Sequence, residues 1–412
     1  MISFSYYRPR IFPVLGNIHD AEIDRAQSIS VPTTLNRTKV EEIGRDGAVG
    51  YLATSPSVAY TLSQFEYGNI ELYEKLTNQT AHGESGEDGI TQADFKTPYF
   101  DICAYMVDDD ETFRGTVWYP ALRTAGFSLN ISEPQAVIER SFDFVGESAV
   151  VWQGANKYVI YGYHTAGSGS DTDIDLSAKP PVLDPDTTST YMLRVVRVTA
   201  AGVSSVLVDG TDFTYTDGTK TLAITSITAD DVIKYWYTSG TAPTTQFTDN
   251  DTDAAGLMGD CASIYLYVPA SGSPTSSDYI YRLQSVGLDV RFDREDLREI
   301  GNKDVVLRGV KNTTVTATLG RKVEQWTIEE ALRGAIADYG KIDVEEFSDE
   351  LALIVKIFSD NTKTTLAYGV VCTGMSPTSV NVSPSVGNYT DGETTIEGTS
   401  FTISQDTTVL GI

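Results

Sequence analysis

Closely spaced aspartates are the residues of this chain whose type and spacing could most directly do chemistry. Asp249, Asp251, Asp253 and Asp260 stand at the first, third, fifth and twelfth positions of one stretch. Carboxylates at these positions are typical of a loop that binds Ca²⁺. Ala254, however, stands where such a loop needs a glycine for its tight turn. Calcium is therefore the one cofactor that the sequence suggests, and a solvated acidic loop without metal is the alternative.

Residue patterns that would support catalysis are weak. The three histidines, His19, His82 and His164, stand in turn-like contexts, and neither HExxH nor GxSxG occurs. The three cysteines are far apart in the sequence and predict neither a disulfide framework nor a zinc site. The sequence therefore predicts a protein that is not an enzyme.

The strongest signal in the composition is negative charge. Acidic residues number 57 against 30 lysines and arginines, and the formal net charge is −27. Such a surface repels the phosphate backbone, so we expect no tight binding of nucleic acid. The same charge would suit a bore through which DNA slides, with Asp108, Asp109 and Asp110 as candidates to line it, or a haloarchaeal setting. A surface turn is the alternative for these aspartates.

The elements that must position these residues are mostly strands. Short runs rich in Thr, Val, Ile and Tyr, bounded by turn-forming residues, predict a mainly β fold. Two segments predict helices: residues 327–340, where Thr327 and Glu330 form a capping box, and NIELYEKL, which begins at Asn69. No run of about 18 apolar residues occurs, so no membrane span is expected.

An internal repeat organises the strands. The segment RAQSISVPTTLNRTKVEEIG (25–44) aligns without gaps with RLQSVGLDVRFDREDLREIG (282–301), and seven of the twenty positions are identical. The alignment continues through later pairs: Val58 with Val315, Leu62 with Leu319, and Gly146 with Gly398. Self-similarity over this length predicts two similar domains, each with one helix, over roughly 20–150 and 275–410.

A different segment separates the two copies. Linker-like stretches flank short strands with Asp-Gly turns at 209–210 and 217–218, which predicts a small inserted β-sandwich with its core at about 180–240. The predicted organisation is a first repeated domain over 1–163, linkers and insert over 164–260, and a second repeated domain over 261–412.

This order of parts resembles the major tail tube proteins of long-tailed, siphovirus-like viruses of bacteria and archaea. In each copy an amphipathic strand leads into a charged segment ending EEIG or REIG, followed by a hairpin, one helix and closing strands. The resemblance implies that each copy is a tail-tube-type β-barrel or sandwich with one helix. It implies the duplicated type, in which three chains form a pseudo-sixfold ring. The insert between the copies departs from the family pattern.

The function that the resemblance implies is structural. The chain would be the major tail tube subunit of a virion, and its trimeric rings would stack into a tube whose bore conducts DNA during ejection. Its partners would be copies of itself, the tail terminator, the tape measure and baseplate or tip proteins, without a membrane. It would assemble in the host cytoplasm and remain in the virion tail. A capsid decoration protein or a cell-surface layer protein is the alternative.

Charged residues that recur in both copies are candidates for the ring interface. Three pairs recur: Arg25 with Arg282, Arg37 with Arg294, and Glu42 with Glu299. A pseudo-symmetric interface requires like residues at equivalent places, so we expect some of these residues to form salt bridges between neighbouring domains. Edge charges that act within each domain are the alternative.

Overall fold

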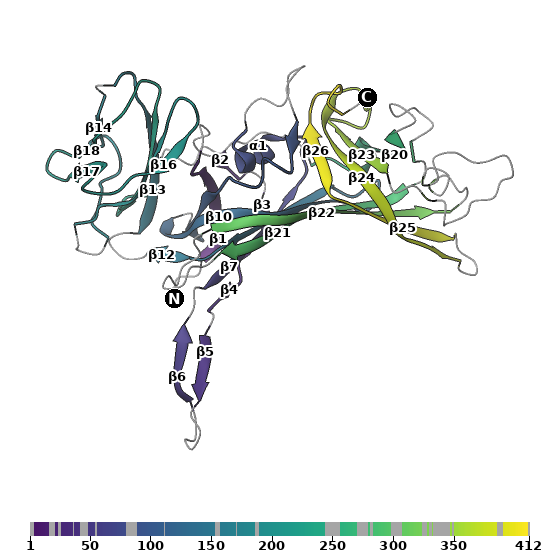
Figure 1. Cartoon of the computed structure of the whole chain (residues 1–412), viewed down its shortest axis with the longest axis horizontal. Helices are drawn as coiled ribbons and strands as arrows, with labels where there is room; N and C mark the ends of the chain where they lie inside the picture. Colours follow the sequence, from purple (N-terminus) through teal and green to yellow (C-terminus); the bar gives the residue numbers. More distant parts are fainter. Residues whose placement is uncertain are drawn as a thin grey trace.

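Two copies of one β unit lie side by side and share a long central sheet, and a third, smaller β unit lies at one end (Figure 1). The computed structural model describes residues 4–410 with gaps. The residues outside the description are 1–3, 16–20, 24–25, 36, 42–47, 54–55, 80–88, 111, 153–156, 170, 186–188, 244–255, 270–278, 281–282, 298–306, 324–327, 329–331, 333–346, 348–349, 385–389 and 411–412.

The central layer is one antiparallel sheet, here called the shared sheet. Its strand order is β3 (Ala26–Ser30) with β4 (Thr33–Thr34), β7 (Ser57–Phe65), β11 (Glu139–Gly146), β10 (Phe113–Ile131), β21 (Leu283–Leu297), β22 (Leu307–Lys322), β25 (Asp391–Gly398) and β24 (Leu366–Ser383). Apolar residues alternate along these strands, for example Val286, Leu288 and Val290 in β21, and so place one face of the sheet on the core.

Two smaller sheets cover the core face of the shared sheet, one in each copy. The first outer sheet contains β2 (Ala21–Glu22), β1 (Phe4–Pro13), β9 (Phe100–Asp108), β10 and β12 (Val150–Trp152). The second contains β20 (Ala262–Tyr267), β23 (Leu351–Phe358), β24, β26 (Ser400–Ser404) and β8 (Ile90–Thr91). β10 and β24 are long strands whose two halves lie in different layers. The expected mainly β fold with sandwich-like domains is confirmed, whereas no sheet of the described residues closes into a barrel.

The register of the strands matches the repeat found in the sequence. Gly146 pairs with Val58 in the first copy, and Gly398 pairs with Val315 in the second. Irregularities recur as well, because the register shifts between Thr124 and Gly126 in β10 and between Pro377 and Ser379 in β24. Bulges are specific features of a backbone, so their recurrence shows two copies of one structure.

One helix packs on the core of the first copy. α1 (Glu71–Thr77) follows Asn69, whose side-chain oxygen accepts the Glu71 N–H at 2.6 Å, and it ends at Asn78 in the left-handed conformation. The expected helix at NIELYEKL is therefore confirmed. Of the segment 327–340, only Ile328 and Leu332 lie within the described residues, and both are helical and buried.

The insert consists of two small sheets. One contains β13 (Tyr158–Thr165), β19 (Val232–Ser239), β15 (Met192–Val198) and β16 (Ser204–Val206), and the other β14 (Asp173–Asp175), β18 (Thr221–Ile224) and β17 (Phe213–Thr216). β13 straddles the expected boundary at residue 163 but pairs along its whole length with β19, so it belongs to the insert.

The insert packs on the outward face of the first outer sheet. Phe12, Tyr105 and Trp118 of that sheet share a buried cluster with Tyr161 and Trp236 of the insert. This interface also contains a buried ion pair, in which Arg194 Nη1 contacts Asp101 Oδ1 at 2.6 Å. The layers from one side to the other are therefore the shared sheet, the core, the first outer sheet and the insert.

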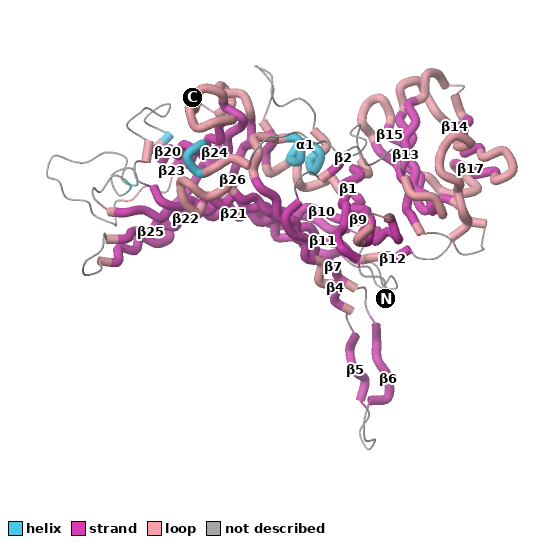
Figure 2. The backbone as a smooth tube through the Cα atoms, turned by 180° about the vertical axis from the view of Figure 1, so that it is seen from behind, coloured by secondary structure: helices cyan, strands magenta, loops and turns pink. Residues whose placement is uncertain are grey.

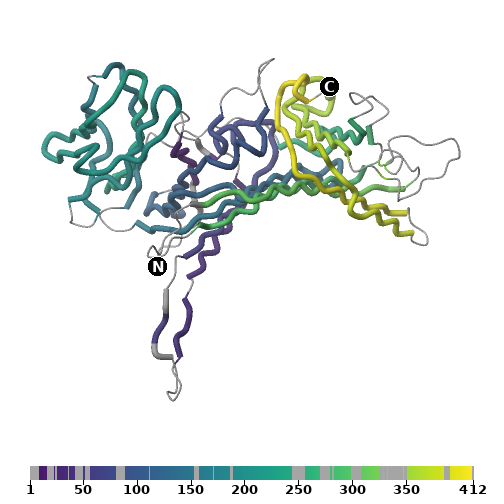
Figure 3. The backbone as a smooth tube through the Cα atoms, viewed as in Figure 1, coloured from purple at the N-terminus to yellow at the C-terminus, as the bar shows by residue number. Residues whose placement is uncertain are grey.

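A two-stranded arm extends away from the shared sheet. It is formed by β5 (Arg37–Glu41) and β6 (Ala48–Ala53), and it projects from the ends of β4 and β7 in both views (Figures 1 and 2). In the tube drawing, β22, β24 and β25, coloured green to yellow, lie toward the other end of the shared sheet (Figure 3). Among the described residues, no helix has the length and apolar character that crossing a membrane requires.

Candidate assembly interface at the junction of the two copies

The two copies are joined by direct strand pairing. β10 of the first copy pairs with β21 of the second, from Gly126 opposite Arg291 to Ile131 opposite Val286. A Cβ atom at Gly126 would lie 2.5 Å from the Val290 carbonyl oxygen, so only glycine permits this approach of the two backbones. The junction is therefore a continuous part of the shared sheet.

Aromatic side chains from both copies fill the core beneath this pairing. Phe95 stacks on Phe292 with ring centroids 5.2 Å apart, and Phe127 meets Phe401 edge to face at 5.3 Å. Phe95 and Phe127 belong to the first copy, and Phe292 and Phe401 belong to the second. The junction thus has an apolar core like that of a domain interior, which is typical of a permanent interface.

Arg294 crosses the junction from the second copy. Its guanidinium donates to the backbone carbonyls of Thr124 at 2.5 Å and Phe95 at 2.8 Å, both in the first copy. Burial, together with the nearby Arg123 and Arg308, lowers its pKa to about 9. The sequence predicts salt bridges for some of the recurring charged residues, and the partners of Arg294 among the described residues are carbonyl oxygens.

A buried polar cluster also joins the copies. Glu66 accepts the Tyr368 hydroxyl at 2.6 Å and lies 3.3 Å from Arg140 Nη1, and both charged side chains are fully buried. Burial raises the pKa of Tyr368 well above its usual value. Burial also acts to lower the pKa of Arg140, but Glu66 together with the neighbouring tyrosines Tyr368, Tyr73 and Tyr67 outweighs it and the pKa is raised. Sequence reasoning did not single out these residues, because nothing local indicates that they meet.

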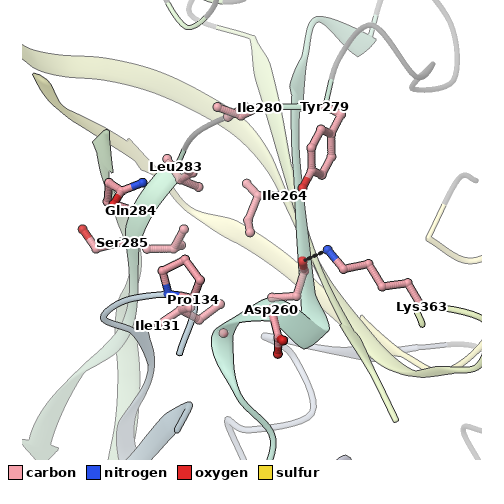
Figure 4. A pocket seen from close by; sticks show the side chains of 13 residues that line it. Ile131, Pro134, Asp260, Ile264, Tyr279, Ile280, Leu283, Gln284, Ser285 and Lys363 are labelled. Carbon is pink, nitrogen blue, oxygen red and sulfur yellow. Dashed lines mark hydrogen bonds between the residues drawn. The ribbon is translucent and has the colours of Figure 1, made fainter. Parts of the chain in front are cut away.

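A small hollow lies at one end of the junction (Figure 4). Its volume is about 140 Å³, and its lining joins Ile131 and Pro134 of the first copy to Leu283 and Gln284 of the second. Lys363 approaches from the side and donates to the Ala262 carbonyl at 2.7 Å (Figure 4). The ammonium group of Lys363 is therefore engaged with the backbone at the edge of the hollow.

The strands that form the junction have counterparts at the two ends of the shared sheet. β24 is the counterpart of β10, and β3–β4 are the counterpart of β21. Within the described part of the chain, no strand pairs with the outer edge of β24 from Ser376 to Ser383 or with the outer edge of β3–β4. Each end of the molecule therefore presents one half of the same junction.

Exposure differs sharply between the junction and its counterparts. Leu129 in β10 is 1% exposed, whereas its counterpart Val382 in β24 is 38% exposed. Phe292 in β21 is 3% exposed, whereas its counterpart Leu35 is 63% exposed. Apolar residues that the junction buries are thus left in solvent at both ends, which is typical of an interaction surface.

Pro32 leaves the outer edge of β3–β4 able to pair. Its carbonyl accepts the Ala59 N–H of β7 at 3.1 Å, so its backbone faces inward. Because neighbouring residues of a strand face opposite ways, Val31 and Thr33 direct their N–H and C=O groups outward. A proline that blunts an edge would face the other way.

The face of the shared sheet away from the core is polar and acidic. Ser, Thr and small residues alternate there with carboxylates: Glu139, Asp143, Glu393 and Glu397, which are exposed, and Asp289, which is half-buried. Arg291 lies on this face beside Asp289, with Nε 2.7 Å from Oδ2. The face is therefore negative along both copies.

The remaining candidate residues have other positions. Arg37 is exposed on the arm, and Arg25, Glu42, Arg282 and Glu299 lie outside the described residues. Asp249, Asp251 and Asp253 also lie outside them, and Asp260 is exposed on the short helix η1 (Gly259–Cys261). The residues that the structure describes contain no group of three or more His, Cys, Asp or Glu able to hold a metal.

Asp108 closes the turn between β9 and β10. It is buried, accepts the Thr112 N–H at 2.8 Å and pairs with Arg114 at 2.5 Å. The Thr112 N–H and Arg114 hold its pKa below the usual value. Of the three expected bore-lining aspartates, only Asp109 and Asp110 are exposed, and they lie in the first outer sheet's turn.

Comparisons with known proteins add little. No protein-family model matches the chain, and no curated protein matches it. Among solved structures, a chain of the anti-feeding prophage (AFP) baseplate, determined by cryo-EM with sixfold symmetrisation, is similar at 12% identity and a TM-score of 0.28. The match covers 37% of this chain and 97% of that chain.

Proposed function

We propose that this chain is a structural subunit that joins copies of itself edge to edge into a closed ring. The observation that supports this is the junction itself: the chain contains one complete junction and presents both of its halves at the ends. An interface between two different surfaces of one chain makes a ring when the rotation closes. Three chains would then contribute six equivalent domains with six equivalent junctions.

The register of the junction between chains follows from the one within the chain. Leu129 opposes Leu288, and Phe127 opposes Val290. At the free edges the same positions place Val382 opposite Val31 and Val380 opposite Thr33. Val382 and Val31 would be buried against each other, as their counterparts are.

We further propose that the rings stack into the major tail tube of a virion, located in its tail. The acidic face of the shared sheet would line the bore, since the insert occupies the opposite side. A negative wall repels DNA phosphates and would let DNA pass during ejection. The tail terminator, the tape measure and tip proteins would be partners at the tube ends. We expect such a subunit to have no catalytic role and to need no cofactor.

The edge residues provide the test. Val382→Asp places a charge in the proposed junction, and we expect it to abolish ring formation in mass photometry and electron microscopy. Val206→Asp is the matched control, because Val206 is an exposed valine on the insert strand β16 and far from either edge. Assembly of Val382→Asp at the wild-type level would refute the proposal.

A further inference from the structure

The arm has an equivalent in the second copy that is fully engaged. Arg37 pairs with Ala53 and Lys39 with Tyr51 in the arm. Their counterparts, Arg294 with Val310 and Asp296 with Arg308, form the end of the β21–β22 hairpin in the same register. The arm and the end of that hairpin are therefore equivalent elements of the two copies, but the arm projects away from the shared sheet (Figure 1).

The end of the β21–β22 hairpin is held by the first copy. Arg294 donates to carbonyls of Thr124 and Phe95, as described above, and Arg308 Nη2 lies 3.5 Å from Glu147 Oε1. The β21–β22 ladder has a register shift between Asp293 and Arg294, and these contacts hold the part of the hairpin beyond that shift. Contacts across the junction thus position this element in the second copy.

The arm, in contrast, exposes apolar side chains, and in the described part of the chain its two strands have no strand partner other than each other. Leu35 at its base is 63% exposed and Tyr51 is 65% exposed. An isolated two-stranded hairpin is marginally stable in water, so the arm needs a surface to pack on. Within the described residues, β5 and β6 pair only with each other.

We infer that the arm packs on the second domain of a neighbouring copy, with Arg37 crossing the junction between chains. The guanidinium of Arg37 donates there to the Pro377 carbonyl, which is the counterpart of the Thr124 carbonyl. Leu35 becomes buried as Phe292 is. This inference rests on the proposed edge-to-edge assembly, and it adds a second contact that fixes the arm and the direction of the ring contact.

Removal of the Arg37 guanidinium should weaken assembly without destroying the edge pairing. A hydrogen bond from a charged donor is worth enough to change an equilibrium by about tenfold or more. We expect Arg37→Ala to raise the subunit concentration for half-maximal ring formation by about that factor. Arg291→Ala is the matched control, since Arg291 is an exposed arginine whose described partner, Asp289, lies within the same strand.

Cross-linking distinguishes this inference from the proposed function. Arg37→Cys with Pro377→Cys should give chains linked to one another by a short bismaleimide in assembled rings. Arg294→Cys with Thr124→Cys is the control for reach, because these positions are in contact within one chain. The native cysteines Cys103, Cys261 and Cys372 are buried and give little background.

The cross-linking experiment has three informative outcomes. Rings with links between chains support the inference. Rings without such links, while the control pair reacts, overturn the arm contact but leave the edge-to-edge assembly intact. The absence of rings in the wild-type protein overturns both.

Discussion

Individual buried charges are the most sensitive points of this molecule. Arg140 and Glu66 are both fully buried, and together with Tyr368 they tie the first copy to the second. Arg140→Met would leave the Glu66 carboxylate buried without its cation. We expect a loss of about 3–5 kcal/mol in the free energy of unfolding, measured by denaturant titration. A loss below about 1 kcal/mol would show that the pair is not what holds the copies together.

Lys234 should make the folding stability of the protein depend on pH. This fully buried lysine of β19 donates to the Pro13 carbonyl of β1 at 2.8 Å, and burial lowers its pKa to about 7. An unfolded lysine titrates near 10.4, so between about pH 7 and 10.4 the unfolded chain binds more protons than the folded one. Folding stability should therefore rise with pH across this window.

The Lys234→Met variant isolates that effect. The difference in melting temperature between wild type and Lys234→Met should change steadily from pH 7 to pH 10 in favour of the wild type. A difference that is constant over this window would contradict the assignment of the lowered pKa to Lys234.

Among the elements, the strand register was predictable and the choice of partners was not. The sequence alignment paired Val58 with Val315 and Gly146 with Gly398, and the ladders agree. β13 was expected in the first repeated domain, because a strand pattern does not say which distant strand it joins. For the same reason sequence reasoning singled out Arg294 but not its carbonyl partners, which lie about 170 to 200 positions away.

At the scale of elements, we expect that the insert cannot be removed without loss of stability. Its core is shared with Phe12, Tyr105 and Trp118 of the first outer sheet, so it is not a detachable module. Deletion of residues 158–239 should expose these side chains and cause aggregation or a large drop in melting temperature. Polar replacement of the three residues in the deleted chain should restore part of the solubility. Unchanged stability after simple deletion would show that the insert folds independently of the sheet beneath it.

At the scale of the whole molecule, the two faces of the shared sheet differ in charge: one is acidic and the other packs on the apolar core. If the acidic face lines a bore, Asp143→Lys with Glu393→Lys and Glu397→Lys should make assembled rings retain DNA, with affinity that falls steeply as salt rises. Asp109→Lys with Asp110→Lys is the control, since that turn lies in the first outer sheet. Retention of DNA by the control variant but not by the first would contradict the proposal, because the acidic face would then not line the bore.

We propose that the junction inside one chain is repeated between chains. Cryo-electron microscopy of the assembled protein tests it most directly. We expect rings of three chains in which β24 of one chain pairs with β3–β4 of the next, with Val382 opposite Val31. A monomer at high concentration, flat arrays, or rings whose contacts lie away from these edges would contradict it.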